Sequence, residues 1–160
     1  MHLFSFMAVS ADGYHSTLDR DVGWQTFGPE FTEYSAEQLD EVDTLVLGRV
    51  TYEEMVAFWM SDVGSDFDAR IADRMNSLAK FVVSRSLQTV NWGASDISLT
   101  TVEGIAELKT NRRGSAAILG SSGLTATLLR AHLVDELRLM VNPVILDEGQ
   151  KLFAGSGTVP

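Results

Sequence analysis

The segment from Ser115 to Leu133 constrains the fold most strongly, because a short apolar run ends there at a pair of glycines and a helical pattern follows. Residues 116–119 (AAIL) are apolar and few, which is typical of a buried strand. Leu124 and Leu128 are spaced by four residues, as on one face of a helix. The segment therefore predicts a strand, a turn at residues 120–123 (GSSG) and a helix, in that order.

The predicted turn suits an anionic ligand. Gly120 and Gly123 leave room for a ligand to approach the backbone, a serine between them can cap the helix, and the free N–H groups of the first helical turn favour negative charge. A nucleotide pyrophosphate would fit such a site. A plain connection between strand and helix would use the same residues, and the spacing differs from the G-x-G-x-x-G of doubly wound dinucleotide-binding folds.

The alternation of strand and helix patterns runs through the whole chain. It predicts an α/β fold with a largely parallel sheet that helices cover on both faces. Ligands of such sheets bind beyond the carboxyl ends of the strands, where the sequence has residues 48–51, 84–85 and 120–123. Thr51 is expected to cap the helix that follows it. The expected strands cover residues 2–9, 44–48, 81–83, 97–100, 116–119 and 134–146, and the expected helices cover residues 29–41, 51–59, 67–78, 102–108 and 124–133.

Composition and charge limit the partners. A chain of 160 residues with 45% hydrophobic content is long enough for one domain with a sizeable core. We therefore expect residues 1–160 to form a single domain. The formal net charge of −10 disfavours nucleic acid as a partner. A small anionic ligand then needs cations of its own, and Arg49 and Arg85 lie where predicted strands end.

The chain has no apolar run of membrane-spanning length and does not begin with a basic leader. We therefore expect a cytoplasmic protein without a membrane partner. The absence of cysteine excludes disulfides and thiolate metal sites. The histidines His2, His15 and His132 are too scattered to suggest a metal site, so no metal is expected.

The stretch from His15 to Gly28 has no periodicity and predicts a long polar loop. Long loops often carry functional residues, so we expect substrate specificity to lie here. Trp24 in this loop fits two roles, either stacking on a flat substrate ring or anchoring the loop. The small, polar tail from Phe153 to Pro160 is also expected to be a loop.

Three segments resemble one known family. Residues 48–53 (GRVTYE), after a predicted strand, are similar to the G-R-x-T-[WY]-E segment of the dihydrofolate reductase fold. Residues 7–14 (MAVSADGY) resemble the S-x-D-G-[FY] opening of the reductase domain of riboflavin-biosynthesis deaminase-reductases and their small stand-alone relatives. Residues 133–149 resemble the L-V-D-E-L…P-V-L…G segment of that group. The likeness covers nearly the whole chain, with the segments in the family's order.

The resemblance implies a dihydrofolate reductase-like fold, a three-layer α/β/α arrangement with a mostly parallel mixed sheet, and NADPH as the cofactor. It implies that nicotinamide lies beside the first strand, pyrophosphate at the glycine turn and adenosine ribose at the end of the third strand. A guanidinium at Arg85 would suit the 2′-phosphate through paired hydrogen bonds. The cofactor-binding residues implied in this way are Ala8, Val9, Gly48, Arg49, Thr51, Ser84, Arg85, Gly120, Ser121, Ser122, Gly123 and Leu124.

The catalytic group is harder to locate. Hydride transfer to a ring needs a group that protonates or orients that ring, which in dihydrofolate reductase is a carboxylate on the first helix. Asp12 and Glu30 are the candidates here, with Glu33 and Glu37 nearby, although each also fits an ordinary solvated charge. The sequence lacks the zinc-binding cysteines of the fused deaminase, and residues 19–21 (DRD) supply few cations for a ribose phosphate.

Two functions are therefore expected as alternatives. The first is an NADPH-dependent reductase that transfers hydride to a small, flat heteroaromatic substrate of pyrimidine or pterin type, as in riboflavin biosynthesis. The second is an NADPH-binding dimeric module without efficient reductase activity. The family fold normally continues with a further strand pair beyond the point where this sequence ends. An open sheet edge invites pairing with a second copy, so a homodimer is expected, as in the relatives.

Overall fold

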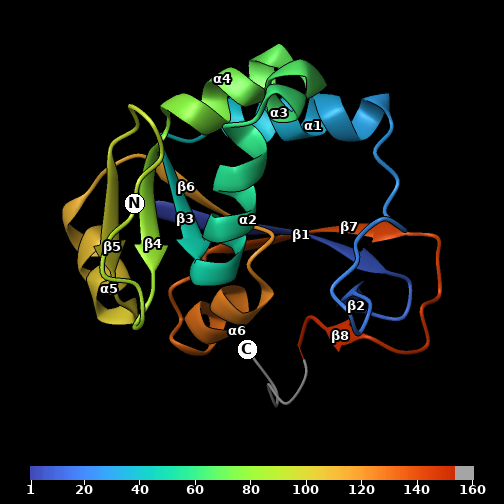
Figure 1. The fold of residues 1–160 in the computed structure, drawn as a ribbon. Coiled ribbons are helices and arrows are strands. Elements are labelled where there is room, and N and C mark those ends of the chain that lie inside the picture. Colours follow the sequence, from blue (N-terminus) through green and yellow to red (C-terminus); the bar gives the residue numbers. More distant parts are fainter. Residues whose placement is uncertain (154–160) are drawn as a thin grey trace.

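A six-stranded parallel sheet forms the centre of the computed structural model, which describes residues 1–153 (Figure 1). Each neighbouring pair of strands is parallel, so all carboxyl ends lie at one edge of the sheet. The expected α/β architecture is confirmed. Across the sheet, the strands follow the order β5 (Ile97–Thr100), β4 (Ala79–Val83), β3 (Thr44–Gly48), β6 (Ser115–Leu119), β1 (His2–Ser10) and β7 (Glu136–Asn142).

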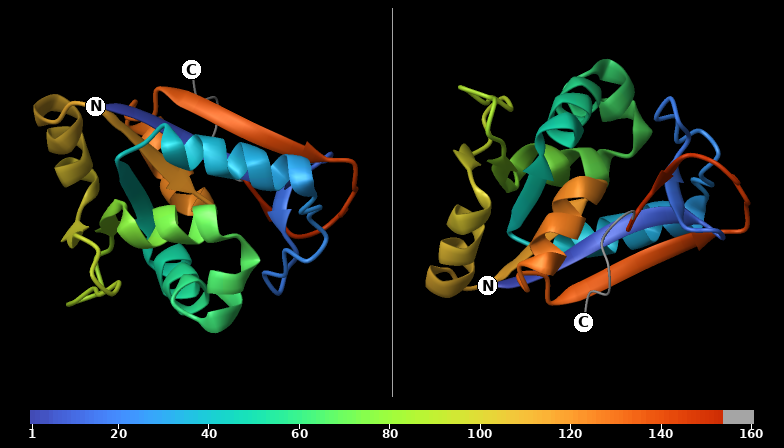
Figure 2. Two further views of the ribbon diagram at one scale, coloured as in Figure 1. Left: turned by 90° about the horizontal axis from the view of Figure 1, so that it is seen from above. Right: turned by 90° about the horizontal axis from the view of Figure 1, so that it is seen from below.

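Helices cover both faces of this sheet, which gives three layers. Figure 2 shows α1 and α4 in front in one view and α6 in front in the opposite view. The helices α1 (Pro29–Asp40), α2 (Arg49–Trp59) and α4 (Ala69–Ser77) pack on one face, with α3 (Asp62–Phe67) between α2 and α4. The other face carries α5 (Val102–Asn111) and α6 (Ser122–Arg130).

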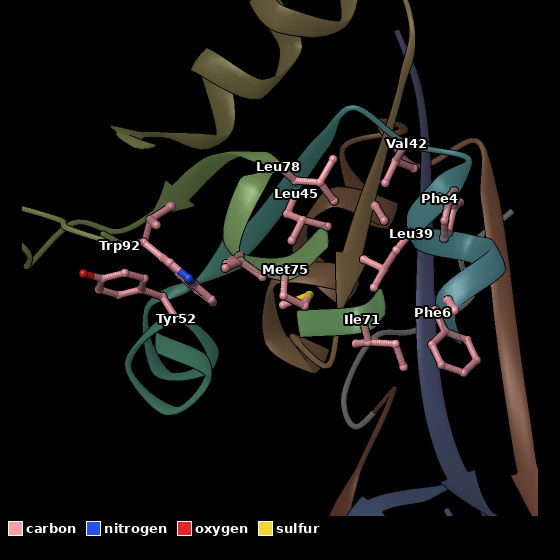
Figure 3. Packing of buried hydrophobic residues seen from close by; sticks show 14 residues of the cluster. Phe4, Phe6, Leu39, Val42, Leu45, Tyr52, Ile71, Met75, Leu78 and Trp92 are labelled. Atoms are coloured by element: carbon pink, nitrogen blue, oxygen red, sulfur yellow. The ribbon is translucent and has the colours of Figure 1, made fainter. Parts of the chain in front are cut away.

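The core follows from the alternation of side chains along each strand. Leu45 and Leu47 of β3 are fully buried in the cluster that includes α1, α2 and α4, whereas Val46 between them packs with residues of α5 and α6. In the larger cluster, Leu39 of α1 points toward Ile71 and Met75 of α4 (Figure 3). Strands buried on both faces are therefore nearly continuous apolar runs, as the sequence shows.

The strand register aligns the carboxyl ends of neighbouring strands in the sheet. Gly48 at the end of β3 lies opposite Val83 at the end of β4, and Phe6 of β1 lies opposite Leu119 at the end of β6. The residues that follow these strands, including Ser84 and Gly120, therefore reach the same edge of the sheet.

The expected helix over residues 67–78 is present as α4, but it begins two residues later than expected. Asp68 is extended (φ −161°, ψ 117°), and its side chain accepts a hydrogen bond from the Ile71 N–H at 3.0 Å, which caps α4. Thr51 is not a cap, because α2 already begins at Arg49 after the N-cap Gly48.

The polar stretch after β1 is not entirely a loop either. Residues Tyr14–Ser16 form β2, which pairs antiparallel with β8 (Gln150–Lys151) apart from the main sheet. Within residues 1–153 the main sheet contains no antiparallel pair, and the antiparallel pairing lies in the separate β2–β8 sheet.

The expected C-terminal loop covers residues 153–160, of which 154–160 lie outside the described part of the chain. Among the described residues, no helix combines the length and the apolar character needed to cross a membrane.

Candidate functional site

A groove of about 740 Å³ lies at the carboxyl edge of the sheet. Its floor and walls come from the carboxyl ends of β3 and β4, from the residues that follow β5 and β6, and from the first turns of α2, α5 and α6, with one side closed by the β2–β8 pair. The residues that contribute to it by sequence segment are 15–16, 20, 22, 48–51, 54, 83–85, 101–103, 120–124, 127 and 150. The groove therefore joins segments that are more than a hundred residues apart in the chain.

Backbone contacts hold the two central turns of the groove together. The Gly48 N–H donates a hydrogen bond to Ser121 Oγ at 3.0 Å, and Thr51 Oγ1 donates to the Gly120 carbonyl at 3.4 Å. A Cβ at Gly48 would lie 3.7 Å from Leu124 Cβ, so the two turns are already in van der Waals contact. Gly120 has φ +62°, a conformation that side chains rarely adopt. The starts of α2 and α6 are thus fixed side by side.

Helix N-termini give the groove a positive potential. The first turns of α2, α5 and α6 all line it, and the initial N–H groups of a helix have no carbonyl partner in their own helix. The predicted serine cap of α6 is not formed: Ser121 is the N-cap residue, but its hydroxyl bonds the Gly48 N–H instead of its own helix. This arrangement leaves the first-turn amides of α6 available to an anion.

Three arginines line the groove in a protein of strongly negative net charge. Arg49 Nη1 pairs with Glu53 Oε2 at 2.7 Å along α2, and both side chains are half exposed. Arg85 is exposed and forms no ion pair with any described residue. Arg20, with φ +67°, comes from the loop after β2 and was not expected in the site. The groove therefore concentrates cations where helix N-termini already favour anions.

A second, apolar pocket of about 310 Å³ adjoins the groove. It lies between β1 and the helices α1, α2 and α4. Its lining residues Phe6, Leu39, Ile71 and Met75 belong to the larger hydrophobic cluster (Figure 3). Most of its lining is aliphatic, aromatic or methionine side chains, namely Phe6, Met7, Ala8, Val22, Phe31, Leu39, Met55, Trp59, Phe67, Ile71, Met75 and Leu119. Its polar lining residues are few, and two of them, Ser35 and Gln38, lie on α1.

The groove and the pocket share a wall. His15, Val22, Thr51, Glu54 and Gly120 line both of them. His15 lies on β2, and burial lowers the pKa of its imidazole from the usual 6.5. Glu54 lies one turn after Thr51 on α2, with an exposed side chain. These are the titratable side chains that both cavities have in common within residues 1–153.

The structure brings most of the expected cofactor residues together. The groove is lined by Gly48, Arg49, Thr51, Ser84, Arg85, Gly120, Ser121, Ser122, Gly123 and Leu124. Ala8 instead lines the apolar pocket, close to the shared wall. Val9 lines neither cavity, because its side chain is buried with Met7 and Leu152.

The expected catalytic carboxylates are not brought to either cavity. Asp12 accepts hydrogen bonds from Ser10 Oγ at 2.7 Å and from the backbone N–H groups of Leu146 at 3.2 Å and Asp147 at 2.8 Å. These bonds, led by that from Ser10, lower the pKa of Asp12 to about 2, so it is a poor proton donor. Glu30 is exposed in the first turn of α1 and lines neither cavity.

Trp24 also lines neither cavity, and Trp59 of α2 contributes an indole to the apolar pocket instead. The loop after β2 nevertheless supplies Val22 and Gln25 to that pocket. Sequence reasoning missed Glu54 and Gln38, and it included His15 only as the first residue of the expected specificity loop. A usable signal existed for Gln38, which follows Phe31 and Ser35 at spacings of four and three and so lies on the inward face of α1.

Comparison with known proteins agrees with this arrangement. The protein family model described as the RibD C-terminal domain matches residues 1–159. Among curated proteins, the chain is 28% identical over 149 residues to YyaP of Bacillus subtilis (strain 168), a protein described as uncharacterized. That match covers 92% of this chain and 77% of YyaP.

Several solved structures share the fold. A protein of Shewanella sp. PV-4, named provisionally for riboflavin biosynthesis, has a TM-score of 0.67 at 22% identity and is matched over 95% of this chain and 82% of that one. Dihydrofolate reductase from Enterococcus faecalis, complexed with NADP(H) and RAB-propyl, has a TM-score of 0.62 at 19% identity over 94% and 76% of the two chains.

A third similar structure is the diaminohydroxyphosphoribosylaminopyrimidine deaminase/5-amino-6-(5-phosphoribosylamino)uracil reductase of Thermotoga maritima. Its TM-score is 0.65 at 17% identity, and the match covers 96% of this chain but 48% of that longer one. At these identities the structures establish the fold, which is dihydrofolate reductase-like as expected. Because the family model covers almost its entire length, this protein belongs to the family of the RibD C-terminal domain.

Proposed function

We propose that this protein is an NADPH-dependent reductase that reduces a small, flat ring in the apolar pocket. The observation that carries the proposal is the wall that the groove and the pocket share at Thr51 and Gly120. A reductase must hold a charged dinucleotide and an apolar ring in contact, and two adjoining cavities of opposite chemistry meet that requirement. Bound NADPH would supply the hydride.

The groove fits a phosphorylated dinucleotide. The amides at the start of α6 and the paired turn at Gly48 suit a pyrophosphate, with Arg49 beside them. Arg85, free of carboxylate partners among the described residues, suits a 2′-phosphate through its forked N–H groups. The dihydrofolate reductase of E. faecalis, which shares the fold, was solved with NADP(H).

The apolar pocket would orient the ring and exclude water from it. Its aromatic and aliphatic lining gives a flat ring favourable contacts, and a low-polarity surround strengthens electrostatic interactions at the reacting atoms. Reduction also needs a proton. His15 and Glu54 line both cavities, so they can hold or relay a proton at the point where the two ligands meet.

A cofactor titration tests the binding part of the proposal. NADPH should quench the tryptophan fluorescence of the protein and accept energy from Trp59, and it should bind more tightly than NADH. Oxidation of NADPH should then be followed with pterins, aminopyrimidine ribosides, quinones and other flat ring compounds. Absence of NADPH binding, or equal affinity for NADPH and NADH, would contradict the assignment of the groove.

One observation favours the alternative of an NADPH-binding module without efficient turnover. No carboxylate of α1 lines the apolar pocket, where Phe31, Ser35, Gln38 and Leu39 are the helix residues present. NADPH binding without oxidation for any acceptor would support that alternative. Loss of turnover in Glu54→Gln and His15→Phe with unchanged NADPH affinity would support the reductase.

A further inference from the structure

The side chain of Gln38 is buried without a hydrogen-bond partner. Its relative exposure is 2%, and neither its amide nitrogen nor its amide oxygen is bonded to any described residue. The hydroxyl of Ser35, one turn earlier on α1, is also buried and unpartnered. Buried polar groups are nearly always hydrogen-bonded, since an unpaired amide in an apolar environment destabilises the fold. Two such groups on one helix face therefore require an explanation.

Both side chains belong to the apolar pocket. Phe31, Ser35 and Gln38 follow one another at spacings of four and three, which places them on one face of α1, and all three line the pocket. The neighbouring Leu39 points toward Ile71 and Met75 of α4 (Figure 3). Most of the pocket lining is hydrocarbon or thioether, and none of its described polar groups is hydrogen-bonded to the Gln38 amide.

The chemistry of the amide limits what can satisfy it. A glutamine side chain offers two donors and one acceptor side by side, so its best partner is a group with an acceptor and a donor in the same order. A lactam edge, the N–H and C=O of a cyclic amide, is such a group. The serine hydroxyl can donate or accept beside it.

The charge of the lining excludes other ligands. None of the described residues that line the pocket is lysine or arginine, and Glu54 carries negative charge at the shared wall. A carboxylate or phosphate inside the pocket would be desolvated without a cation to pair with. The occupant is therefore neutral at its buried end.

We propose that the apolar pocket binds an uncharged, flat ring through a lactam edge that hydrogen-bonds the Gln38 amide, assisted by Ser35. The assignment of this ring as the substrate rests on the proposed reductase function, whereas the binding chemistry stands on the pocket alone. The pocket thus selects neutral amide-bearing rings over acidic ones.

Calorimetric measurement of the affinity for three compounds that share a two-ring skeleton tests this proposal. Quinolin-2(1H)-one carries a lactam edge, naphthalene has none, and naphthalene-2-carboxylate carries a charge. The full chain, with and without NADP⁺, should bind quinolin-2(1H)-one on the order of tenfold to a hundredfold more tightly than naphthalene, the usual effect of leaving a buried polar group unpaired. It should not bind the carboxylate measurably.

The variant Gln38→Met keeps the size of the side chain and removes its amide. Its affinity for quinolin-2(1H)-one should fall to that for naphthalene, while its affinity for naphthalene and for NADPH stays the same. Its melting temperature without ligand should rise, because the unpaired amide is gone. Glu37→Met, an exposed position next to it on α1, is the matched control and should keep the preference of the wild type.

Equal affinity of the wild type for quinolin-2(1H)-one and naphthalene would overturn the inference, as would a preference that survives in Gln38→Met. The same titrations separate this inference from the proposed function. NADPH binding without a lactam preference refutes the inference alone, and a lactam preference without NADPH binding refutes the reductase proposal while supporting the pocket chemistry.

Discussion

Arg85 follows β4 at the rim of the groove, where its exposed guanidinium meets no carboxylate of the described residues. It differs in this respect from Arg49, whose charge is shared with Glu53 on the same helix. An arginine that is free of internal partners contributes its full charge to a ligand. It can therefore distinguish a cofactor with a 2′-phosphate from one without it.

The variant Arg85→Ala should bind NADPH about tenfold to a hundredfold more weakly and NADH with nearly unchanged affinity, since one charge-assisted contact is lost. Fluorescence titration with both cofactors measures this. Arg113→Ala, an exposed arginine before β6 at the opposite edge of the sheet, serves as the control and should change neither affinity. A parallel loss for NADPH and NADH in Arg85→Ala would assign Arg85 to the pyrophosphate instead.

Residue identity alone did not predict which carboxylates line the two cavities. Asp12 belongs to a segment that resembles the family opening, yet its carboxylate bonds Ser10 and the backbone after β7, so it ties that connection to the first strand. Glu54 was overlooked because a single glutamate on a helix has no distinctive spacing, and Gln38 because its spacing from Phe31 and Ser35 indicates an inward helix face but no ligand contact. Their positions follow from how α1 and α2 pack, which depends on the whole core.

Among the elements, the β2–β8 pair closes one side of the groove through His15, Ser16 and Gln150. It was not predicted, because strands of two or three polar residues show no alternation that distinguishes them from loops. The main strands were predictable, since most of them are short apolar runs that end at or just before a glycine or a serine, whereas β7 shows the alternation of a half-buried strand. The break between α3 and α4 depends on the Asp68 cap, which a continuous apolar spacing conceals.

Gly149 makes the β2–β8 pair possible. It has φ +145°, and a Cβ there would lie 2.3 Å from the Ser16 carbonyl oxygen, a contact that backbone atoms cannot relieve locally. We expect Gly149→Ala to separate β2 from β8, raise amide exchange at residues 14–16 and weaken NADPH binding, with the main sheet intact. Hydrogen exchange followed by mass spectrometry measures the first effect.

Gly13→Ala is the matched control for Gly149→Ala. Gly13 also has positive φ, +87°, but a Cβ there meets nothing within 4 Å. In Gly13→Ala the free energy of unfolding should fall by about 1–2 kcal/mol from backbone strain alone, and β2 should stay paired with β8. Equal amide exchange at residues 14–16 in both variants would mean that backbone strain, and not the contact with Ser16, controls the pairing of β2 with β8.

For the whole molecule, the pH dependence of stability should reflect Lys80. This side chain is 1% exposed, and its Nζ donates to the Leu78 carbonyl at 2.6 Å and to Ser95 Oγ at 3.0 Å. Burial lowers the pKa of Lys80 to about 8 from the usual 10.5. Between these two values the unfolded chain holds the proton more tightly than the folded one.

Stability should therefore rise with pH from about 8 to about 10.5 because of Lys80, at up to about 1.4 kcal/mol per pH unit. Below pH 8 both states carry the proton, and the contribution is constant. Urea unfolding of wild type and Lys80→Met across this range isolates the effect, with exposed Lys151→Met as the control that keeps the wild-type slope. Parallel profiles for wild type and Lys80→Met would contradict the assignment.

Assembly is the second property of the whole molecule. The edge strand β7 exposes Leu139 (43%) and Val141 (60%) on one face, and no strand among residues 1–153 pairs with its outer edge. We expect a homodimer through this strand at micromolar concentration. Val141→Lys should raise the dissociation constant of the dimer at least about tenfold by placing a charge in an apolar contact.

Sedimentation velocity across a concentration series measures this shift, and NADPH titration should show that Val141→Lys still binds cofactor. The control is Glu107→Lys, at an exposed position on α5. Thr127→Lys is not suitable as a control, because Thr127 lines the groove. A monomeric wild type, or a dimer that is indifferent to Val141→Lys, would move the interface elsewhere.

The wall common to the groove and the pocket has a practical consequence for finding ligands. A molecule bound in one cavity would form part of the wall of the other cavity, so the protein alone supplies only part of either binding site. Each occupant should strengthen the other by the same factor, as thermodynamic linkage requires. Compound screens run on the empty protein would then underestimate its true ligands, and screens run with oxidised cofactor present would rank them correctly.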